Sequence, residues 1–142
     1  MLYEEGALAL DDPVSAYIPA FADLALYKPD APDQRTSLPC VPTIHDLLTH
    51  RAGFTYGFFS NTAVDSMYRS DGVFGPGDLE AFCERLAALP LLYAPGERWH
   101  YSVATDVLGR VVEVASGQSL DSFFETRIFA PLEMHDLSLI HI

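Results

Sequence analysis

Basic residues are scarce in this chain of 142 residues. Eight Lys and Arg stand against 20 Asp and Glu, which gives a formal net charge of −12 at pH 7. A surplus of negative charge repels phosphate backbones and anionic lipid surfaces. The charge balance therefore argues against nucleic acid as a partner.

Long apolar runs and export signals are missing as well. No apolar run approaches the roughly 20 residues that span a bilayer, so the sequence predicts no membrane span. The opening residues, MLYEEGALALDDP, carry acids where a signal peptide would carry Lys or Arg. No signal peptide is visible, and both the cytoplasm and the periplasm stay open as locations of the parent protein.

The sequence also has no motif for a metal site or a disulfide scaffold. Cys40 and Cys83 lie far apart and have neither metal-binding spacing nor the number expected of a disulfide scaffold. His45 and His50 are five residues apart, so a helix would place them on different faces, whereas zinc ligands on one helix prefer a spacing of four. We expect free thiols, no metal site and no cofactor.

Apolar residues at helical spacing dominate what is present. The pattern predicts helices within 43–53, 62–69, 78–89, 101–116 and 119–130, and a loop over the proline-rich residues 27–42. Thr43, Asp78 and Ser119 stand at expected N-caps, and Gly53 at the end of the first helical segment. Almost no convincing strand pattern occurs.

An activated nucleophile is not visible. The sequence has no Gly-x-Ser-x-Gly motif and no glycine-rich phosphate loop. None of its ten serines is followed by Lys three positions later, and Lys28 is its only lysine. From the residues alone, no covalent catalysis can be assigned.

The segment PGERWHYSV, residues 95–103, places aromatic residues where a helix start usually has small capping residues. We expect Trp99 to anchor the turn in apolar contacts and His100 to face solvent or a loop. Tyr101 is either a core anchor or a phenol presented for chemistry. A phenol ionises near pH 10 and needs a nearby cation to act as a base, so these residues alone favour the structural role.

Three segments, in order, resemble the β-lactamase-related serine hydrolases. TIHDLLTHRAGF is similar to the family's T-I-x-x-L-L-x-H-x-x-G segment, and PGERWHYS and SFFETRIFAPLEM resemble the next two. This family includes class C β-lactamases, D-Ala-D-Ala carboxypeptidases and family VIII carboxylesterases. The resemblance extends from about Leu2 to about Met134.

The resemblance implies an α+β fold of the β-lactamase/transpeptidase type. Residues 1–136 would form a partial domain, mainly the helical subdomain, without most of the antiparallel sheet. The Ser-x-x-Lys motif would precede this chain, and the third motif of the family would lie beyond residue 142. Residues 137–142, LSLIHI, do not resemble the family's continuation, and we expect them to be a non-native tail.

The resemblance also implies an acyl-enzyme mechanism. In the family, a serine attacks an ester or amide carbonyl, and the tyrosine of a Tyr-x-Asn motif moves the proton. Tyr101 matches that tyrosine and becomes the expected catalytic base, with Ser102 and Val103 as expected substrate-binding residues. Val103 replaces the motif's Asn and cannot donate a hydrogen bond to an acylamido group, which favours simple esters. Alternatively, Val103 is the first core residue of its helix.

Three functions follow from these expectations. The first is a fragment of a serine hydrolase, an esterase that cleaves small carboxylic esters. The second keeps the fold but makes the protein a β-lactamase or a D-Ala-D-Ala carboxypeptidase. The third is a non-catalytic helical interaction module or pseudoenzyme. The first two imply a small ester or a β-lactam-like molecule as partner, and the oligomeric state stays open.

Overall fold

The computed structural model describes residues 1–31 and 36–137, and short helices make up most of its regular structure. No helix in these two ranges is long and apolar enough to cross a membrane. The elements in chain order are η1 (Val14–Ala16), η2 (Pro19–Asp23), β1 (Ala25–Leu26), β2 (Thr36–Ser37), α1 (Ile44–Leu48), α2 (Ala63–Ser70), α3 (Leu79–Ala87), α4 (Ala104–Ser116), α5 (Leu120–Phe124) and η3 (Glu125–Phe129).

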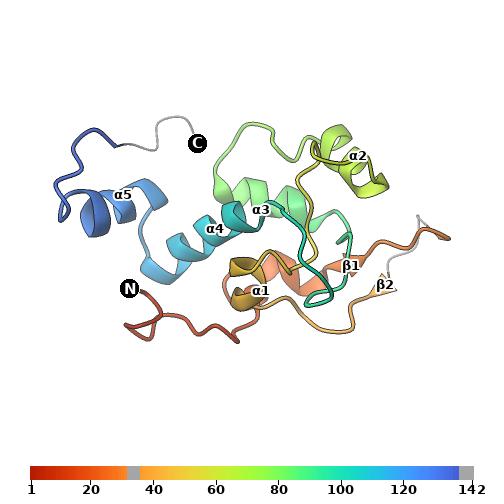
Figure 1. The fold of residues 1–142 in the computed structure, drawn as a ribbon, viewed down its shortest axis with the longest axis horizontal. Coiled ribbons are helices and arrows are strands. Elements are labelled where there is room, and N and C mark those ends of the chain that lie inside the picture. Colours follow the sequence, from red (N-terminus) through yellow and green to blue (C-terminus); the bar gives the residue numbers. More distant parts are fainter. Residues whose placement is uncertain (32–35, 138–142) are drawn as a thin grey trace.

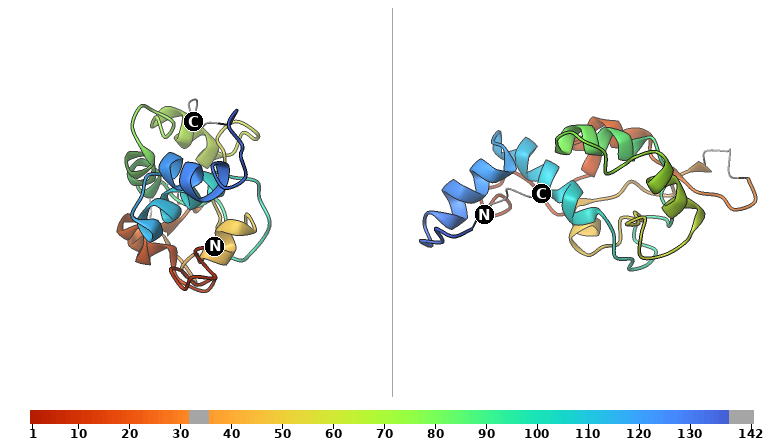
Figure 2. Two further views of the ribbon diagram at one scale, coloured as in Figure 1. Left: turned by 90° about the vertical axis from the view of Figure 1, so that its left-hand side faces the viewer. Right: turned by 90° about the horizontal axis from the view of Figure 1, so that it is seen from above.

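Helix α4 is the centre of the fold and packs against α1, α3 and α5 (Figure 1). Its inner face carries Val107 and Val111, both fully buried. Each buried valine contributes roughly 1.5 kcal/mol or more through removal of apolar surface from water. The same core receives side chains from three other helices: Ile44 and Leu47 of α1, Val64 and Tyr68 of α2, and Phe82, Cys83 and Leu86 of α3. Figures 1 and 2 show α5 and the N-terminus at one end of the molecule and the strands at the other.

The two strands form the only regular sheet in the described part of the chain. β1 pairs with β2 in an antiparallel register that sets Ala25 opposite Ser37. The expected loop over 27–42 thus contains β2, while its residues 32–35 lie outside the described ranges. Of the expected non-native tail, 138–142 lie outside them too, and Leu137 is exposed, so that expectation stays a prediction.

Two predicted N-caps are confirmed by hydrogen bonds. The Thr43 hydroxyl accepts from the Asp46 amide at 3.2 Å, and the Asp46 carboxylate accepts from the Thr43 amide at 3.0 Å. The Asp78 carboxylate accepts from the Ala81 amide at 2.9 Å at the start of α3. A cap of this kind contributes about 1 kcal/mol.

The predicted cap of α5 is satisfied by a different residue. The Ser119 hydroxyl bonds to Ser122 at 3.0 Å, and the Leu120 amide donates to the carboxylate of Glu113 on α4 at 3.1 Å. Ser119 thus stands at the N-cap position without a capping hydrogen bond, and an acidic group of α4 instead accepts from the first amide of α5. The predicted helix over 119–130 is α5 continued by the π-helical η3.

Two helix limits also differ from the predicted ones. α4 begins at Ala104 rather than at Tyr101, because residues 98–102 have no regular secondary structure and Val103 is the N-cap of the helix. α1 ends at Leu48, five residues before Gly53.

Gly53 lies at a close crossing of two chain segments. It has φ of +90°, and a Cβ added there would lie 2.0 Å from the carbonyl oxygen of Tyr93. The Gly53 oxygen in turn accepts the amides of Leu92 at 2.8 Å and Tyr93 at 3.3 Å. Only a residue without a side chain permits this contact.

We expect Gly53→Ala to lower the free energy of unfolding by roughly 3 kcal/mol or more, since it adds a backbone clash to left-handed strain. The matched control is Gly72→Ala, because Gly72 has φ of +63° but no atom within 4 Å of an added Cβ. That control should lose only about 1 kcal/mol. Urea unfolding followed by circular dichroism measures both, and equal losses would show that the crossing is not constrained.

Candidate active site around Tyr101

Tyr101 lies in an irregular segment, residues 98–103, directly before α4, and is 46% exposed. The phenol ring stacks on Tyr56, with centroids 5.5 Å apart and planes inclined by 18°. His50 and Phe59 complete its surroundings at centroid distances of 4.9 Å and 5.6 Å. Tyr101 is therefore a surface phenol held among rings and not a core anchor.

The backbone of this irregular segment is fixed by the turn that follows α1. The His100 amide donates to the His50 oxygen at 2.9 Å, and the Val103 amide donates to the Thr55 oxygen at 3.2 Å. His50 itself has φ of +52°, an uncommon conformation for a residue other than glycine. Such strain persists where surrounding contacts over-determine it, and here those contacts position Tyr101.

Trp99 is exposed, contrary to expectation. It is 63% exposed, so the expectation that it anchors the turn in apolar contacts is wrong. The neighbouring residues His100 and Val103 donate backbone hydrogen bonds to residues 50–55, and this contact leaves Trp99 and Tyr101 on the exposed side.

His100 is half-buried and faces the loop that contains Thr55, which is the second of its two expected surroundings. Its Nε2 lies 3.3 Å from the Thr55 hydroxyl, and its ring packs edge-on against Tyr93 at 5.3 Å. Burial lowers the pKa of His100, because desolvation disfavours the charged imidazole.

The two expected substrate-binding residues are both buried. Ser102 is 1% exposed, with its hydroxyl 3.5 Å from Nδ1 of His50, and Val103 is 0% exposed. The position of Val103 favours the alternative that it is a core residue at the start of α4. Contact of either residue with substrate stays a prediction.

Four further rings join Tyr101 in what we call the aromatic surface: Tyr56, Phe58, Phe59, Phe74 and Tyr101. Tyr56 is its centre, with ring centroids 4.6 Å from Phe58, 5.5 Å from Phe59 and 6.0 Å from Phe74. The three phenylalanines are 50% to 68% exposed. No motif or periodicity in the sequence predicts this surface, although the density of aromatic residues in FTYGFF, residues 54–59, is a visible signal.

A buried carboxylate holds the loop that carries Phe58 and Phe59. Asp65, fully buried on α2, accepts hydrogen bonds from the hydroxyls of Thr55, Ser60 and Thr62 and from the amides of Gly57 at 3.1 Å and Thr62 at 2.9 Å. Burial alone would raise the pKa of Asp65, but the hydrogen bonds outweigh it and hold that pKa well below its ordinary range. The loop is therefore built around a permanent negative charge.

A guanidinium group holds the loop that carries Phe74. Arg85 of α3 donates to the carbonyl oxygens of Val73 at 3.1 Å, Gly75 at 3.0 Å and Pro76 at 3.3 Å. Three carbonyls bound by one rigid guanidinium fix the loop in a single arrangement. The hydrogen bonds of Arg85 thus fix the backbone on both sides of Phe74.

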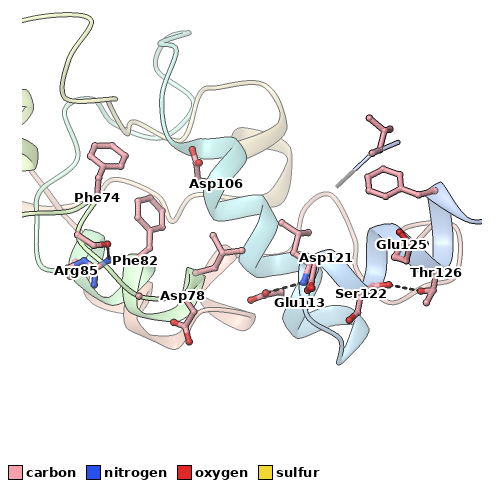
Figure 3. Close-up of a pocket in the computed structure, with 16 residues that line it drawn as sticks. Phe74, Asp78, Phe82, Arg85, Asp106, Glu113, Asp121, Ser122, Glu125 and Thr126 are labelled. Carbon is pink, nitrogen blue, oxygen red and sulfur yellow. Dashed lines mark hydrogen bonds between the residues drawn. The ribbon is translucent and has the colours of Figure 1, made fainter. Parts of the chain in front are cut away.

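Next to the aromatic surface lies a groove of about 800 Å³ between α3, α4 and α5 (Figure 3). Phe74 belongs to both the surface and the groove, whereas Tyr101 does not line the groove. The charged side chains of its lining are Arg85 and five acids, Asp78, Asp106, Glu113, Asp121 and Glu125. Burial raises the pKa of Asp106, which accepts a hydrogen bond from Tyr56. The groove is predominantly acidic.

A family model described as Beta-lactamase matches residues 1–141, and the chain belongs to the β-lactamase family. The resemblance noted in the sequence is thereby confirmed. Members of this family are serine hydrolases, and relatives of the chain include esterases and carboxypeptidases.

Among its relatives, Esterase EstB of Burkholderia gladioli is 40% identical over 98% of this chain and 34% of its own length. A putative D-alanyl-D-alanine carboxypeptidase of Escherichia coli (strain K12) is 34% identical over 92% of this chain and 28% of its own length. The chain therefore spans about a third of the length of these relatives.

A solved structure described as EstCE1, a hydrolase with promiscuous acyltransferase activity, superposes with a TM-score of 0.77 at 33% identity. The match covers 93% of this chain and 33% of that one. The predicted β-lactamase/transpeptidase fold is confirmed, and this chain forms a mainly helical part of it with a small two-stranded sheet.

We expect Asp65→Asn to lower the free energy of unfolding by roughly 3 kcal/mol at pH 7, because an amide nitrogen cannot accept the hydrogen bonds that one carboxylate oxygen accepts. The folded-state pKa of Asp65 is depressed. Its stabilisation is therefore complete above the ordinary aspartate pKa of about 3.9 and declines as the pH falls below that value.

The difference between wild type and Asp65→Asn should accordingly shrink by roughly 1 kcal/mol between pH 7 and pH 3. Thermal or urea unfolding at the two pH values measures it. The control is Asp23→Asn, at an exposed position, which should change stability little at either pH. A pH-independent difference for Asp65→Asn would show that its carboxylate is not preferentially stabilised by folding.

Proposed function

We propose that this chain is part of a serine hydrolase that cleaves carboxylic esters through an acyl-enzyme, with Tyr101 as its catalytic base. The observation that carries the proposal is the half-exposed Tyr101 phenol, in a segment whose backbone is hydrogen-bonded to the turn after α1. A relative named an esterase, 40% identical, supports the reaction class. That the full-length protein acts on carboxylic esters is likewise proposed.

In this reaction Tyr101 moves one proton. It accepts the proton of the serine hydroxyl as that oxygen attacks the ester carbonyl, and it returns a proton to the leaving alcohol. A phenol ionises near pH 10, so it needs an adjacent cation to be deprotonated at neutral pH. Because no serine here has Lys three positions later, the proposal assigns the nucleophile and its lysine to a segment outside these residues.

Two features favour esters over β-lactams and peptidoglycan stems. Val103 stands at the motif position of an amide side chain and is buried, so it offers no hydrogen bond to an acylamido group. The neighbouring groove is acidic, and a D-Ala-D-Ala substrate ends in a carboxylate that this charge would repel. The carboxypeptidase alternative keeps the support of a relative of that name.

We expect Tyr101→Phe in the full-length protein to lower kcat/KM for an ester by 10²-fold to 10⁴-fold, the usual contribution of a general base. The variant keeps the ring and its stacking on Tyr56, so the melting temperature should hardly change. Tyr3→Phe, at an exposed tyrosine of the N-terminal turn, is the control and should retain activity. Full activity of Tyr101→Phe would assign the tyrosine to structure alone.

The reaction class is tested with two chromogenic substrates. The full-length protein should hydrolyse short p-nitrophenyl esters and leave a chromogenic cephalosporin intact, because the site lacks the amide donor. Hydrolysis of the cephalosporin at a comparable kcat/KM would move the protein to the β-lactamase alternative. Hydrolysis of neither would support the non-catalytic alternative.

A further inference from the structure

We infer that the aromatic surface binds an aromatic group of a neutral ester, and so selects the substrate. This inference rests on the proposed function and names its substrate class. Phe58, Phe59 and Phe74 expose half or more of their side chains, and they adjoin one another through Tyr56. Contiguous apolar exposure of this kind marks binding sites, because water contact with it is unfavourable.

The position of Tyr101 ties this surface to the reaction. Its ring lies 5.5 Å from Tyr56 and 5.6 Å from Phe59, centroid to centroid. A molecule bound on these rings therefore has its adjoining atoms within reach of the phenol. An ester bond next to an aromatic group would meet the proposed base directly.

Ring orientation favours a planar group over a flexible alkyl chain. Phe74 and Tyr101 are inclined to Tyr56 by only 12° and 18°, so the three ring planes are nearly parallel. Phe58 and Phe59 stand edge-on to Tyr56 at 61° and 80°. A planar ring can gain both stacked and edge-to-face contacts on such a surface, whereas an alkyl chain gains neither.

The surface is held in place before any ligand arrives. Asp65 accepts hydrogen bonds from the loop of Phe58 and Phe59, and Arg85 donates three to the loop of Phe74. Exposed rings on loops fixed by polar contacts lose little conformational freedom on binding. This preorganisation distinguishes a binding surface from an apolar loop that has failed to pack.

Local charge favours a neutral ligand. Tyr56 donates a hydrogen bond to the Asp106 carboxylate, which places a negative group beside the centre of the surface. A carboxylate on the substrate would meet repulsion here.

The kinetic test compares 2-naphthylmethyl acetate with octyl acetate in the full-length protein. Both are neutral acetates of primary alcohols, and only the first has a planar group. The variant Phe58→Leu/Phe59→Leu keeps apolar side chains but removes two rings. We expect it to raise KM for the naphthyl ester roughly tenfold relative to KM for octyl acetate measured on the same variant. Tyr3→Leu, outside the surface, is the control and should change neither.

A binding test that needs no catalysis uses the fluorescence of Trp99, the only tryptophan among these 142 residues. Trp99 lies 6.4 Å from the His50 ring, which contacts Tyr101. Titration with 4-nitrobenzyl alcohol, a quencher of indole fluorescence, should give saturable quenching in wild type and in Tyr3→Leu. The double leucine variant should lose saturation.

The two failures are distinguishable. Ester hydrolysis with equal KM values in wild type and the double variant, and no saturable quenching, would overturn the inference and leave the proposed function intact. Saturable quenching without hydrolysis of any ester would overturn the proposed function and the substrate role with it. Quenching in the 142-residue chain but not in the full-length protein would also overturn the inference, because another segment would then cover the surface.

Discussion

Backbone hydrogen bonds between residues 50–55 and 92–103 hold together the two segments from which the candidate site is built. Oxygens of His50, Gly53 and Thr55 accept amides of His100, Leu92 and Val103, in that order, at 2.8 Å to 3.2 Å. These bonds connect parts of the chain that are far apart in sequence. Without them, Tyr101 would have no fixed position relative to Tyr56 and His50, and α4 would have no anchored start.

Buried or half-buried charged side chains fix the loops of the candidate site, and the aromatic side chains of those loops remain exposed. The negative charge of Asp65 and the positive charge of Arg85 each bind backbone or hydroxyl groups of a loop. Hydrogen bonds to charged groups are stronger than those between neutral groups. Loops held this way keep their rings outward, whereas loops held by apolar packing alone would bury those rings.

Membership of the β-lactamase family joins these features to a reaction class. The chain supplies the phenol and the aromatic surface, and it spans about a third of the length of its relatives. Its acidic groove and its buried valine at the motif's amide position both favour neutral esters. In the proposed enzyme, substrate selection therefore follows from the shape and charge of the surroundings of Tyr101.

Local patterns in the sequence determined the helices and their caps. Thr43 and Asp78 cap helices because their oxygens reach amides three residues later, a contact that needs only neighbouring residues. The order of three motifs likewise identified the family and the fold. Tertiary structure alone decided that Trp99 faces outward and that His100 lies half-buried against Thr55. Each of these depends on which distant segment packs against the residue, and neither periodicity nor composition contains that information.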